Sequence, residues 1–227
     1  MLEQKKSATW RQIVEKERAI AVIRSPQLSL GLAMAKAVAD GGIKIIEITW
    51  NSEQPAELIS KLRNQFPTHI IGAGTILNLT DLQGAISSGA QFIFSPHVNL
   101  QLIQAANAAH IPIVPGALTP TEIMTAWQAG ATCVKVFPIS AMGGVNYLKS
   151  LQGPLGNIPL IPTGGVTIAN AREFIEAGAC AVGLAGELFP QKIITAGNWQ
   201  AIAQNAANLK RRLFNNSLTT HSHCHSD

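Results

Sequence analysis

The sequence has little charge, few aromatic residues and few cysteines. Of its 227 residues, only 13% are charged and 5% are aromatic, whereas 47% are hydrophobic. Disordered chains combine low hydrophobicity with high net charge, so this composition excludes a disordered protein. The net charge of +4 is spread along the chain without interleaved aromatic residues. A nucleic-acid partner is therefore not expected.

The sequence also lacks the features of a secreted or membrane protein. Its three cysteines, Cys133, Cys180 and Cys224, are an odd number at wide spacings, which does not indicate a disulfide framework. The N-terminus is polar, without the apolar core of a signal peptide. Charged residues such as Lys36 and Asp40 interrupt the most apolar later helix. We expect a cytoplasmic protein with no membrane partner.

The most informative feature that is present is an internal rhythm of short apolar runs. An amphipathic stretch with apolar residues every three or four positions follows most runs, as in helices that pack on a sheet. Several of these stretches end at a glycine, which supplies the left-handed residue that commonly follows a helix. The eight runs lie at residues 19–25, 44–50, 69–75, 91–97, 112–118, 132–138, 159–166 and 180–186.

Eight strand-then-helix units predict an α/β protein, a parallel (β/α)8 TIM barrel in a single domain. Residues 1–18 are expected to form an extra helix that covers the bottom of the barrel. The barrel itself is expected to occupy residues 19–213 and to end in an outer helix over 196–213. The tail, residues 214–227, is expected to be disordered. The alternative fold is an open doubly wound sheet, but no dinucleotide-binding fingerprint follows the first run.

Lys135 is the first candidate for chemistry, because it lies in the middle of the apolar run CVKVFP. Barrel active sites lie at the carboxyl ends of the strands, and an inward lysine avoids unpaired burial against the helices. A desolvated lysine favours its neutral amine, which attacks a carbonyl to form a Schiff base. The alternatives are a lysine that extends to the barrel mouth or one that pairs with a buried acid.

Glu47 is the second catalytic candidate, a carboxylate inside the equally apolar run KIIEIT. The alternation of a strand places Glu47 and Thr49 on one face, so that an inward Glu47 can meet an inward Lys135. Schiff-base chemistry needs proton transfer at neighbouring atoms of one substrate, which a paired carboxylate and amine can provide. The alternative is a buried ion pair kept for structure.

Glycine-rich loops after the seventh and eighth runs point to phosphate binding. Glycine exposes backbone N–H groups to an anion, and the loops after strands seven and eight of a barrel commonly hold a phosphate. The alternative is that these glycines only form tight turns. The candidate phosphate-binding residues are Thr163, Gly164, Gly165, Gly183, Ala185 and Gly186.

Further candidates for substrate binding lie where the other runs end. Thr75 follows the segment GAG and could bond a substrate carboxylate or hydroxyl group. Pro115 is as readily explained by packing inside a barrel, and His97 by a solvated loop. The candidate substrate-binding residues are Arg24, Thr49, Asn51, Thr75, Pro96, His97, Pro115 and Phe137.

No metal site and no cofactor is predicted. The histidines within the expected barrel, His69, His97 and His110, are far apart in the sequence and lack an accompanying carboxylate cluster. The tail carries histidine and cysteine side chains over residues 221–225. A polar tail of this kind is more often solvated than metal-binding.

Six short motifs together resemble one family, the 2-keto-3-deoxy-6-phosphogluconate and 4-hydroxy-2-oxoglutarate aldolases. The resemblance covers roughly residues 15–190, and the motifs stand in the family's order and spacing. They are IEIT around Glu47, GAGT at 72–75, FSP at 94–96, VPG at 114–116, VKVFP around Lys135 and PTGGV at 162–166.

The resemblance implies a metal-independent class I aldolase that forms a homotrimer. Such an enzyme cleaves a 2-keto-3-deoxy sugar acid phosphate to pyruvate and glyceraldehyde 3-phosphate, or 4-hydroxy-2-oxoglutarate to pyruvate and glyoxylate. Lys135 then matches the Schiff-base lysine, and Glu47 the acid/base glutamate, which works partly through a water. Thr75 matches a residue near the pyruvyl carboxylate, and residues 163–165 match the phosphate loop.

Three positions depart from the family's pattern. Asn51 stands where the family often has an arginine that holds the substrate carboxylate, so a charge-assisted bidentate contact is lost there. Gly186 stands where a serine commonly assists the phosphate, and His97 where glycine is frequent. Arg24, at the end of the first run, is expected to take over anion binding.

Three alternatives to cleavage of 2-keto-3-deoxy-6-phosphogluconate stay open. One keeps the Schiff base but uses an unphosphorylated 4-hydroxy-2-oxo acid, and a second uses another 2-oxo acid, in 2-keto-3-deoxy-6-phosphogalactonate cleavage or oxaloacetate decarboxylation. The third is a non-catalytic sugar-phosphate binding protein. An inward lysine together with an inward glutamate favours an enzyme over the binding protein.

Overall fold

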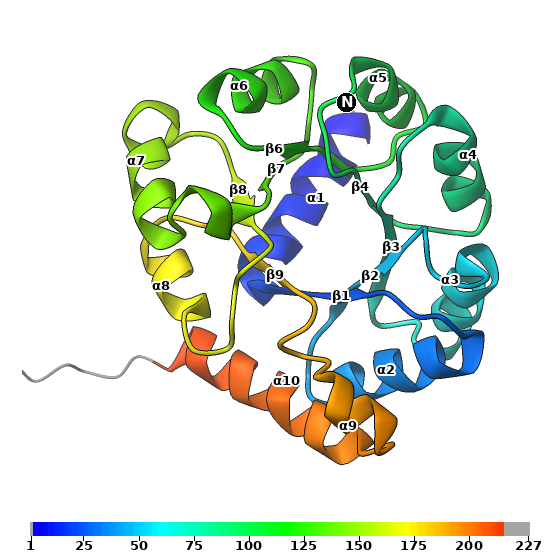
Figure 1. Cartoon of the computed structure of the whole chain (residues 1–227). Helices are drawn as coiled ribbons and strands as arrows, with labels where there is room; N and C mark the ends of the chain where they lie inside the picture. Colours follow the sequence, from blue (N-terminus) through cyan, green and yellow to red (C-terminus); the bar gives the residue numbers. More distant parts are fainter. Residues whose placement is uncertain (1, 216–227) are drawn as a thin grey trace, which may run out of the picture.

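The computed structural model describes residues 2–215, which form an α/β fold with short parallel strands inside and helices outside (Figure 1). Six strands form one curled sheet in the order β5-β4-β3-β2-β1-β9, and three form a second sheet in the order β6-β7-β8. The strands are β1 (Ala19–Ile23), β2 (Ile45–Thr49), β3 (Ile70–Gly74), β4 (Ile93–Phe94), β5 (Ile113–Val114), β6 (Gly116–Ala117), β7 (Val134–Val136), β8 (Leu160–Pro162) and β9 (Val182–Leu184).

Most helices surround the strands as an outer layer, whereas α1 crosses the middle of the ring in this view (Figure 1). None of the helices within residues 2–215 is long and apolar enough to cross a membrane. The helices are α1 (Leu2–Glu17), α2 (Leu28–Asp40), α3 (Pro55–Gln65), α4 (Leu79–Ser87), α5 (Leu100–Ala108), α6 (Pro120–Gln128), η1 (Ile139–Met142), α7 (Val145–Leu155), α8 (Ala171–Glu176), α9 (Gln191–Thr195) and α10 (Trp199–Phe214).

Side chains of the strands divide into an outer and an inner set, because neighbouring residues of a strand point to opposite faces. The outer set, such as Ile46 and Ile48 of β2, packs against the helices in the larger apolar core. The inner set at the amino ends of the strands, such as Ile20, Ile45 and Ile161, forms a second apolar core. The interior is therefore apolar at one end and free to carry polar residues at the other.

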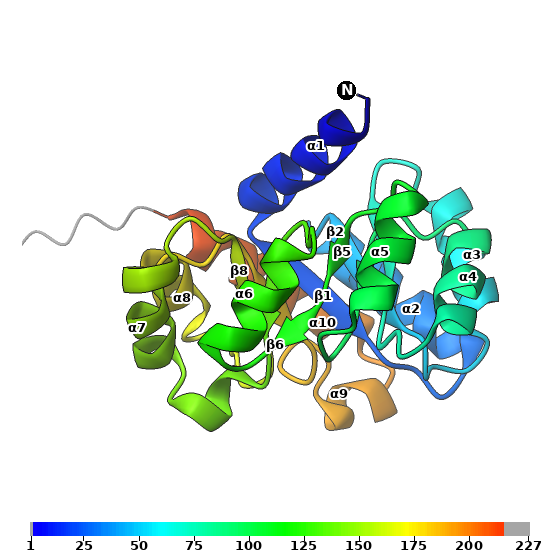
Figure 2. The ribbon, with the colours of Figure 1, turned by 90° about the horizontal axis from the view of Figure 1, so that it is seen from above.

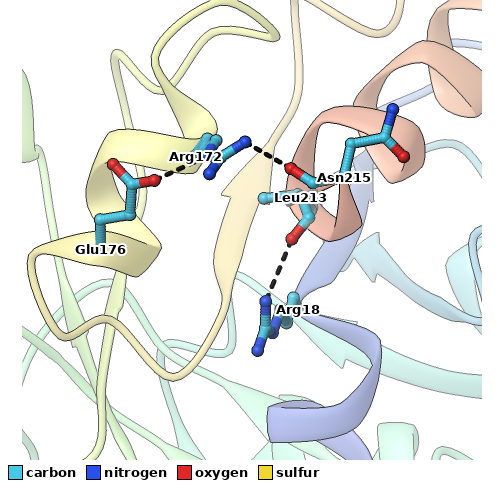
Figure 3. A network of polar contacts seen from close by, with 5 residues as sticks. All are labelled: Arg18, Arg172, Glu176, Leu213 and Asn215. Atoms are coloured by element: carbon cyan, nitrogen blue, oxygen red, sulfur yellow. Dashed lines mark hydrogen bonds and ion pairs between the residues drawn. The ribbon is translucent and has the colours of Figure 1, made fainter. Parts of the chain in front are cut away.

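Helix α1 closes the apolar end of this interior. Its Trp10 and Val14 are buried in the inner core, and the helix lies on the side of the strands opposite α9 (Figure 2). The junction after α1 is held to the end of α10 by a hydrogen bond from Arg18 to the carbonyl of Leu213 (3.0 Å). Arg172 of α8 donates to the carbonyl of Asn215 beside it (Figure 3).

The fold differs from the sequence prediction in the number and continuity of its strands. The fifth predicted strand, 112–118, is divided into β5 and β6 at Pro115, whose missing N–H group interrupts a ladder. The two sheets meet between β8 and β9 at a single bridge, Thr163 with Gly183. The α/β class and the parallel strands are confirmed.

The C-terminal prediction also needs correction. The helix expected over 196–213 begins at Trp199, because the side chain of Asn198 accepts a hydrogen bond from the N–H of Ala201 and caps it there. A separate short helix, α9, precedes it. The predicted tail starts at Phe214, which is the last residue of α10, and residues 216–227 lie outside the described residues.

Candidate active site

A cavity of about 490 Å³ lies at the carboxyl ends of the strands. It is lined by residues from the first strand to the last, which the curled sheet brings around a common mouth. The sequence-predicted site residues that line it are Arg24, Glu47, Thr49, Thr75, Pro96, Lys135, Phe137, Thr163, Gly164, Gly165, Gly183, Ala185 and Gly186.

The period of two in the strands accounts for this convergence. In β2, Ile46 and Ile48 pack toward the helices, whereas Glu47 and Thr49 line the cavity. Lys135 has the same orientation in the middle of β7. The inward orientation predicted for both catalytic candidates is thus the one that the structure shows.

Lys135 is buried, with 6% of its surface exposed. Its Nζ atom lies 4.6 Å from the ring centroid of Phe137 and 5.8 Å from that of Phe94. Its backbone N–H donates to the carbonyl of Pro115 (2.9 Å), which fixes the strand on one side. The amine therefore lies close to two aromatic rings at the wall of the cavity, where a carbonyl compound can reach it.

Glu47 is 2% exposed, and burial raises the pKa of its carboxyl group above the ordinary value. The positive charges of Lys135 and Arg24 lower this pKa, but burial has the larger effect. A raised pKa brings proton uptake and release closer to neutral pH. Both Glu47 and Lys135 line the cavity, but within residues 2–215 they form no ion pair with each other. This disfavours the alternative that the two residues are only a buried ion pair kept for structure.

Gly74 of β3 makes the room for this carboxylate. β2 and β3 pair so that Thr49 lies opposite Gly74. A β-carbon built at Gly74 would collide with Oε1 of Glu47. The second glycine of the segment GAGT, Gly74, therefore has no side chain because the neighbouring strand carries the glutamate.

The turn after β8 requires its glycines. Gly164 and Gly165 have φ angles of +79° and +96°, and a β-carbon at Gly165 would collide with the side chain of Ser140. Thr163 lines the cavity, and its Oγ1 atom is buried without a hydrogen-bond partner among the described residues. A buried unpaired hydroxyl costs stability, so a ligand that bonds it would relieve that cost.

The loops after β1 and β2 are joined by a buried hydroxyl group. The Ser52 Oγ atom accepts a hydrogen bond from the backbone N–H of Ser25 (3.1 Å) and lies 3.2 Å from Oγ1 of Thr49. Arg24, directly before Ser25, lines the cavity and is close enough to lower the pKa of Glu47. This connection fixes the position of the loop that carries the guanidinium.

Thr75 lies at the cavity in a strained conformation, with a φ of +59°. A β-branched residue with a positive φ is a genuine outlier, and such strain persists where the surroundings hold it in place. Its position directly after β3 places a hydroxyl group at the cavity wall.

Three predicted residues do not line the cavity. Asn51 and His97 are exposed on loops beyond β2 and β4, and Pro115 is buried between β5 and β6. Pro115 instead contributes the carbonyl that accepts the Lys135 N–H. Pro115 therefore has a role in packing and in the backbone hydrogen bonds. This agrees with the alternative explanation of Pro115, packing inside the barrel, given from the sequence.

Four cavity residues were not predicted from the sequence: Val22, Val166, Thr167 and Glu187. Val22 was within reach of a period-two argument, because it precedes Arg24 by two positions. The other three follow glycines of loops, where no period indicates direction. Glu187 is an exposed carboxylate beside Gly186, at the part of the cavity predicted to take phosphate.

In the part of the chain from residue 2 to residue 215, no group of three or more histidine, cysteine, aspartate or glutamate side chains is arranged to hold a metal ion. The chemistry that this cavity offers from its own residues is that of an amine, a carboxyl group, a guanidinium and hydroxyl groups.

Comparison with known proteins assigns the family. Residues 11–205 match the aldolase family described as KDPG and KHG aldolase. The chain belongs to this family. The 2-dehydro-3-deoxy-phosphogluconate aldolase of Haemophilus influenzae is 35% identical over 204 residues, which cover 87% of this chain and 95% of that protein. The resemblance found in the motif series is thereby confirmed, as is the prediction of an aldolase, a lyase.

Solved structures resemble this one over most of the chain. The KDPG aldolase of Legionella pneumophila, with pyruvate captured as a covalent carbinolamine intermediate, has a TM-score of 0.81 and 28% identity, and covers 88% of this chain and 97% of its own. A cube-shaped, porous protein cage designed by fusing symmetric oligomeric domains has a TM-score of 0.78 and 32% identity, over 87% of this chain and 72% of that one.

Proposed function

We propose that the chain cleaves 2-keto-3-deoxy-6-phosphogluconate, 4-hydroxy-2-oxoglutarate or both, through a Schiff base on Lys135. The observation that carries this proposal is that the Lys135 amine and the Glu47 carboxyl group open into the same cavity without pairing with each other. Both are nearly completely buried, which suits a nucleophile and a proton carrier at one reacting centre. The relative captured with a pyruvate carbinolamine supports the same chemistry.

The residues can be given roles from their positions. The Lys135 amine attacks the C2 carbonyl of the substrate, and loss of water from the carbinolamine gives the imine. Glu47 carries protons to and from the hydroxyl groups involved, directly or through a water. When the C4 hydroxyl loses its proton, the C3–C4 bond breaks, the aldehyde leaves and the bonding electrons enter the imine as an enamine. Protonation at C3 and hydrolysis then release pyruvate and restore the amine.

Borohydride trapping with pyruvate tests this proposal. The wild-type chain should gain one reduced pyruvyl adduct, because hydride from borohydride fixes the imine as a secondary amine. Intact mass and peptide mapping should locate the adduct on Lys135. A folded chain that gives no adduct would contradict the aldolase mechanism and would favour the sugar-phosphate binding protein.

Arg24 is proposed to bind the substrate carboxylate in place of the arginine that Asn51 replaces. Arg24 lines the cavity, whereas Asn51 lies outside its wall. Arg24→Ala should raise KM for the 2-oxo acid by about tenfold to a hundredfold, since charge-assisted hydrogen bonds have this strength. Asn51→Ala is the matched control, expected to change KM by less than about threefold. Steady-state kinetics check both, and a larger effect of Asn51→Ala would contradict this role of Arg24.

A second candidate substrate is an unphosphorylated 4-hydroxy-2-oxo acid. The part of the cavity formed by the loop after β9 supports this candidate. Gly186 offers no hydroxyl group, and the exposed carboxylate of Glu187 beside it opposes a dianion. A β-carbon at Gly186 would meet no atom within 4 Å, so a serine fits there. The test is to measure kcat/KM for a phosphorylated and an unphosphorylated substrate, both in the wild type and in Gly186→Ser. The substrate with the higher kcat/KM in the wild type is the preferred one. Improvement limited to the phosphorylated substrate would place the phosphate at this loop.

The fold and assembly are also proposed in finer detail. We propose that the two sheets are parts of one closed (β/α)8 barrel, with β5 and β6 as a single strand broken at Pro115 and α1 as an extra helix. We also propose a homotrimer, because a similar chain serves as a symmetric oligomeric domain in a designed cage. Multi-angle light scattering should give three times the mass of one chain.

A further inference from the structure

An aromatic stack of Trp10, Phe92 and Phe94 lies beneath Lys135 and extends to the N-terminal helix. The ring centroids of Trp10 and Phe92 are 5.4 Å apart, those of Phe92 and Phe94 are 5.6 Å apart, and those of Trp10 and Phe94 are 6.5 Å apart. Phe94 continues the stack to the Nζ atom of Lys135, 5.8 Å from its ring centroid. The stack thus connects α1 with the proposed nucleophile.

The interior is shaped to hold this stack. Trp10, Phe92 and Phe94 are each at most 4% exposed. A β-carbon at Gly72 would lie 2.6 Å from the ring of Phe92. The absence of a side chain at this position of β3 therefore leaves room for the ring. Gly72 is paired with Glu47 on β2, which places this space one strand away from the carboxyl group. The stack therefore fills part of the inner apolar core, and its Phe94 ring reaches Lys135.

Trp10 occupies its place without a polar contact. Its Nε1 atom is buried and has no hydrogen-bond partner among the described residues. A buried, unsatisfied N–H group is destabilising, so this indole is not explained by hydrogen bonding. Its contribution is the area of its ring against Phe92 and Phe94.

The helix that carries Trp10 is fixed at its end. Glu17 forms an ion pair with Lys210 of α10 (2.7 Å) in which both side chains are about four-fifths buried, at 18% and 20% exposed. Arg18 donates to the carbonyl of Leu213 on the same helix (Figure 3). α1 is thus held to the last outer helix, which keeps Trp10 in position in the stack.

We propose that Phe94 and Trp10 are positioning residues for Lys135, with Phe94 packed beside the lysine amine behind the cavity wall and Trp10 as the support of Phe94. A lysine side chain has a flexible stem of four carbons. Two rings near Nζ, Phe137 at 4.6 Å and Phe94 at 5.8 Å, limit the freedom of this stem and exclude water from the space that they fill. This inference rests on the proposed function, because it assigns a task to the amine that forms the Schiff base.

Phe94→Leu and Phe92→Leu form a matched pair for the test. Both remove one buried ring of the same stack from the same strand region, so both should lower thermal stability to a similar extent. Of this pair, only Phe94 lies beside Nζ, because among the described residues the rings next to this atom are those of Phe94 and Phe137. Phe94→Leu should reduce kcat and the rate of pyruvate trapping by about tenfold to a hundredfold, with KM little changed. Phe92→Leu keeps an apolar side chain packed against Phe94 and leaves the ring beside Nζ in place, so it should change both rates by less than about threefold.

Trp10 is tested by removal and rescue. Trp10→Ala should slow trapping by about tenfold, and Trp10→Phe, which keeps a ring against Phe94, should restore most of the rate. If wild type is trapped and the two leucine variants lose the same fraction of their rates, the stack has only a structural role and the inference is wrong. If wild type itself is not trapped, the proposed function fails instead.

Discussion

Replacing Lys135 with arginine should lower kcat for aldol cleavage by about 10⁴-fold or more. A guanidinium is protonated at all accessible pH values, so it cannot attack a carbonyl. Arginine does retain a long stem that fills the space beside the rings of Phe94 and Phe137, so the loss would reflect the missing nucleophile and not an empty site. A coupled assay for pyruvate release measures the rate, and borohydride trapping should give no adduct.

Lys149→Arg is the matched control for this variant. Lys149 is exposed on α7 and does not line the cavity, so its replacement should leave kcat within about twofold of wild type. Circular dichroism should show both variants folded. A folded Lys135→Arg protein that keeps more than about a hundredth of the wild-type rate would contradict the role of Lys135 as the nucleophile.

The strand pattern of the fold could be predicted because each strand is buried on both sides. Strands such as β2 and β3 therefore stand out as apolar runs, IIEIT and IIGAG, between amphipathic stretches. The break between β5 and β6 could not be placed from the run 112–118 alone. Whether Pro115 interrupts a strand depends on whether the neighbouring strand would pair with an N–H group at that position. The start of α10 is set by the cap at Asn198. The apolar pattern alone did not show where α9 ends and α10 begins.

The centre of the site was predictable for a related reason. A charged residue in an apolar strand, such as Glu47 or Lys135, is costly to bury against the helices without a partner. The interior of the predicted barrel is the remaining place for its side chain. Loop residues carry no such constraint, so Glu187 escaped prediction and Asn51 was placed at a cavity that it does not line. The contact of Phe94 with Lys135 depends on how distant strands close together, which the sequence does not display.

Glu47→Gln is expected to have the second large effect on activity. The amide keeps the size of the carboxyl group in the space that Gly74 leaves, but it cannot carry a proton between substrate atoms. The value of kcat should fall by about 10²- to 10⁴-fold, the range in which general acid–base groups contribute. Borohydride trapping on Lys135 should still occur at a reduced rate, because the amine itself is retained. Kinetics that match wild type would show that Glu47 is not the proton carrier.

The same substitution should stabilise the fold, and the sign follows from the raised pKa of Glu47. Because burial favours the protonated form in the folded state, the carboxyl group imposes no cost below its ordinary pKa of 4.5, and the cost grows as the pH rises toward the raised value. The amide side chain of the Glu47→Gln variant carries no charge at any pH. The melting temperature of this variant should therefore exceed that of wild type by about 2–8 °C at about pH 8 and by much less near pH 4.

Differential scanning fluorimetry across this pH range measures the difference, with Glu57→Gln as the control. Glu57 lies on α3 and is half exposed in a surface ion pair with Lys61, so its loss should change the melting temperature little. A Glu47→Gln variant that is less stable than wild type at about pH 8 would mean that the attraction of Lys135 and Arg24 outweighs the cost of burial. The expected result is instead a more stable and nearly inactive protein, because the buried carboxylate that the reaction needs is one that folding alone disfavours.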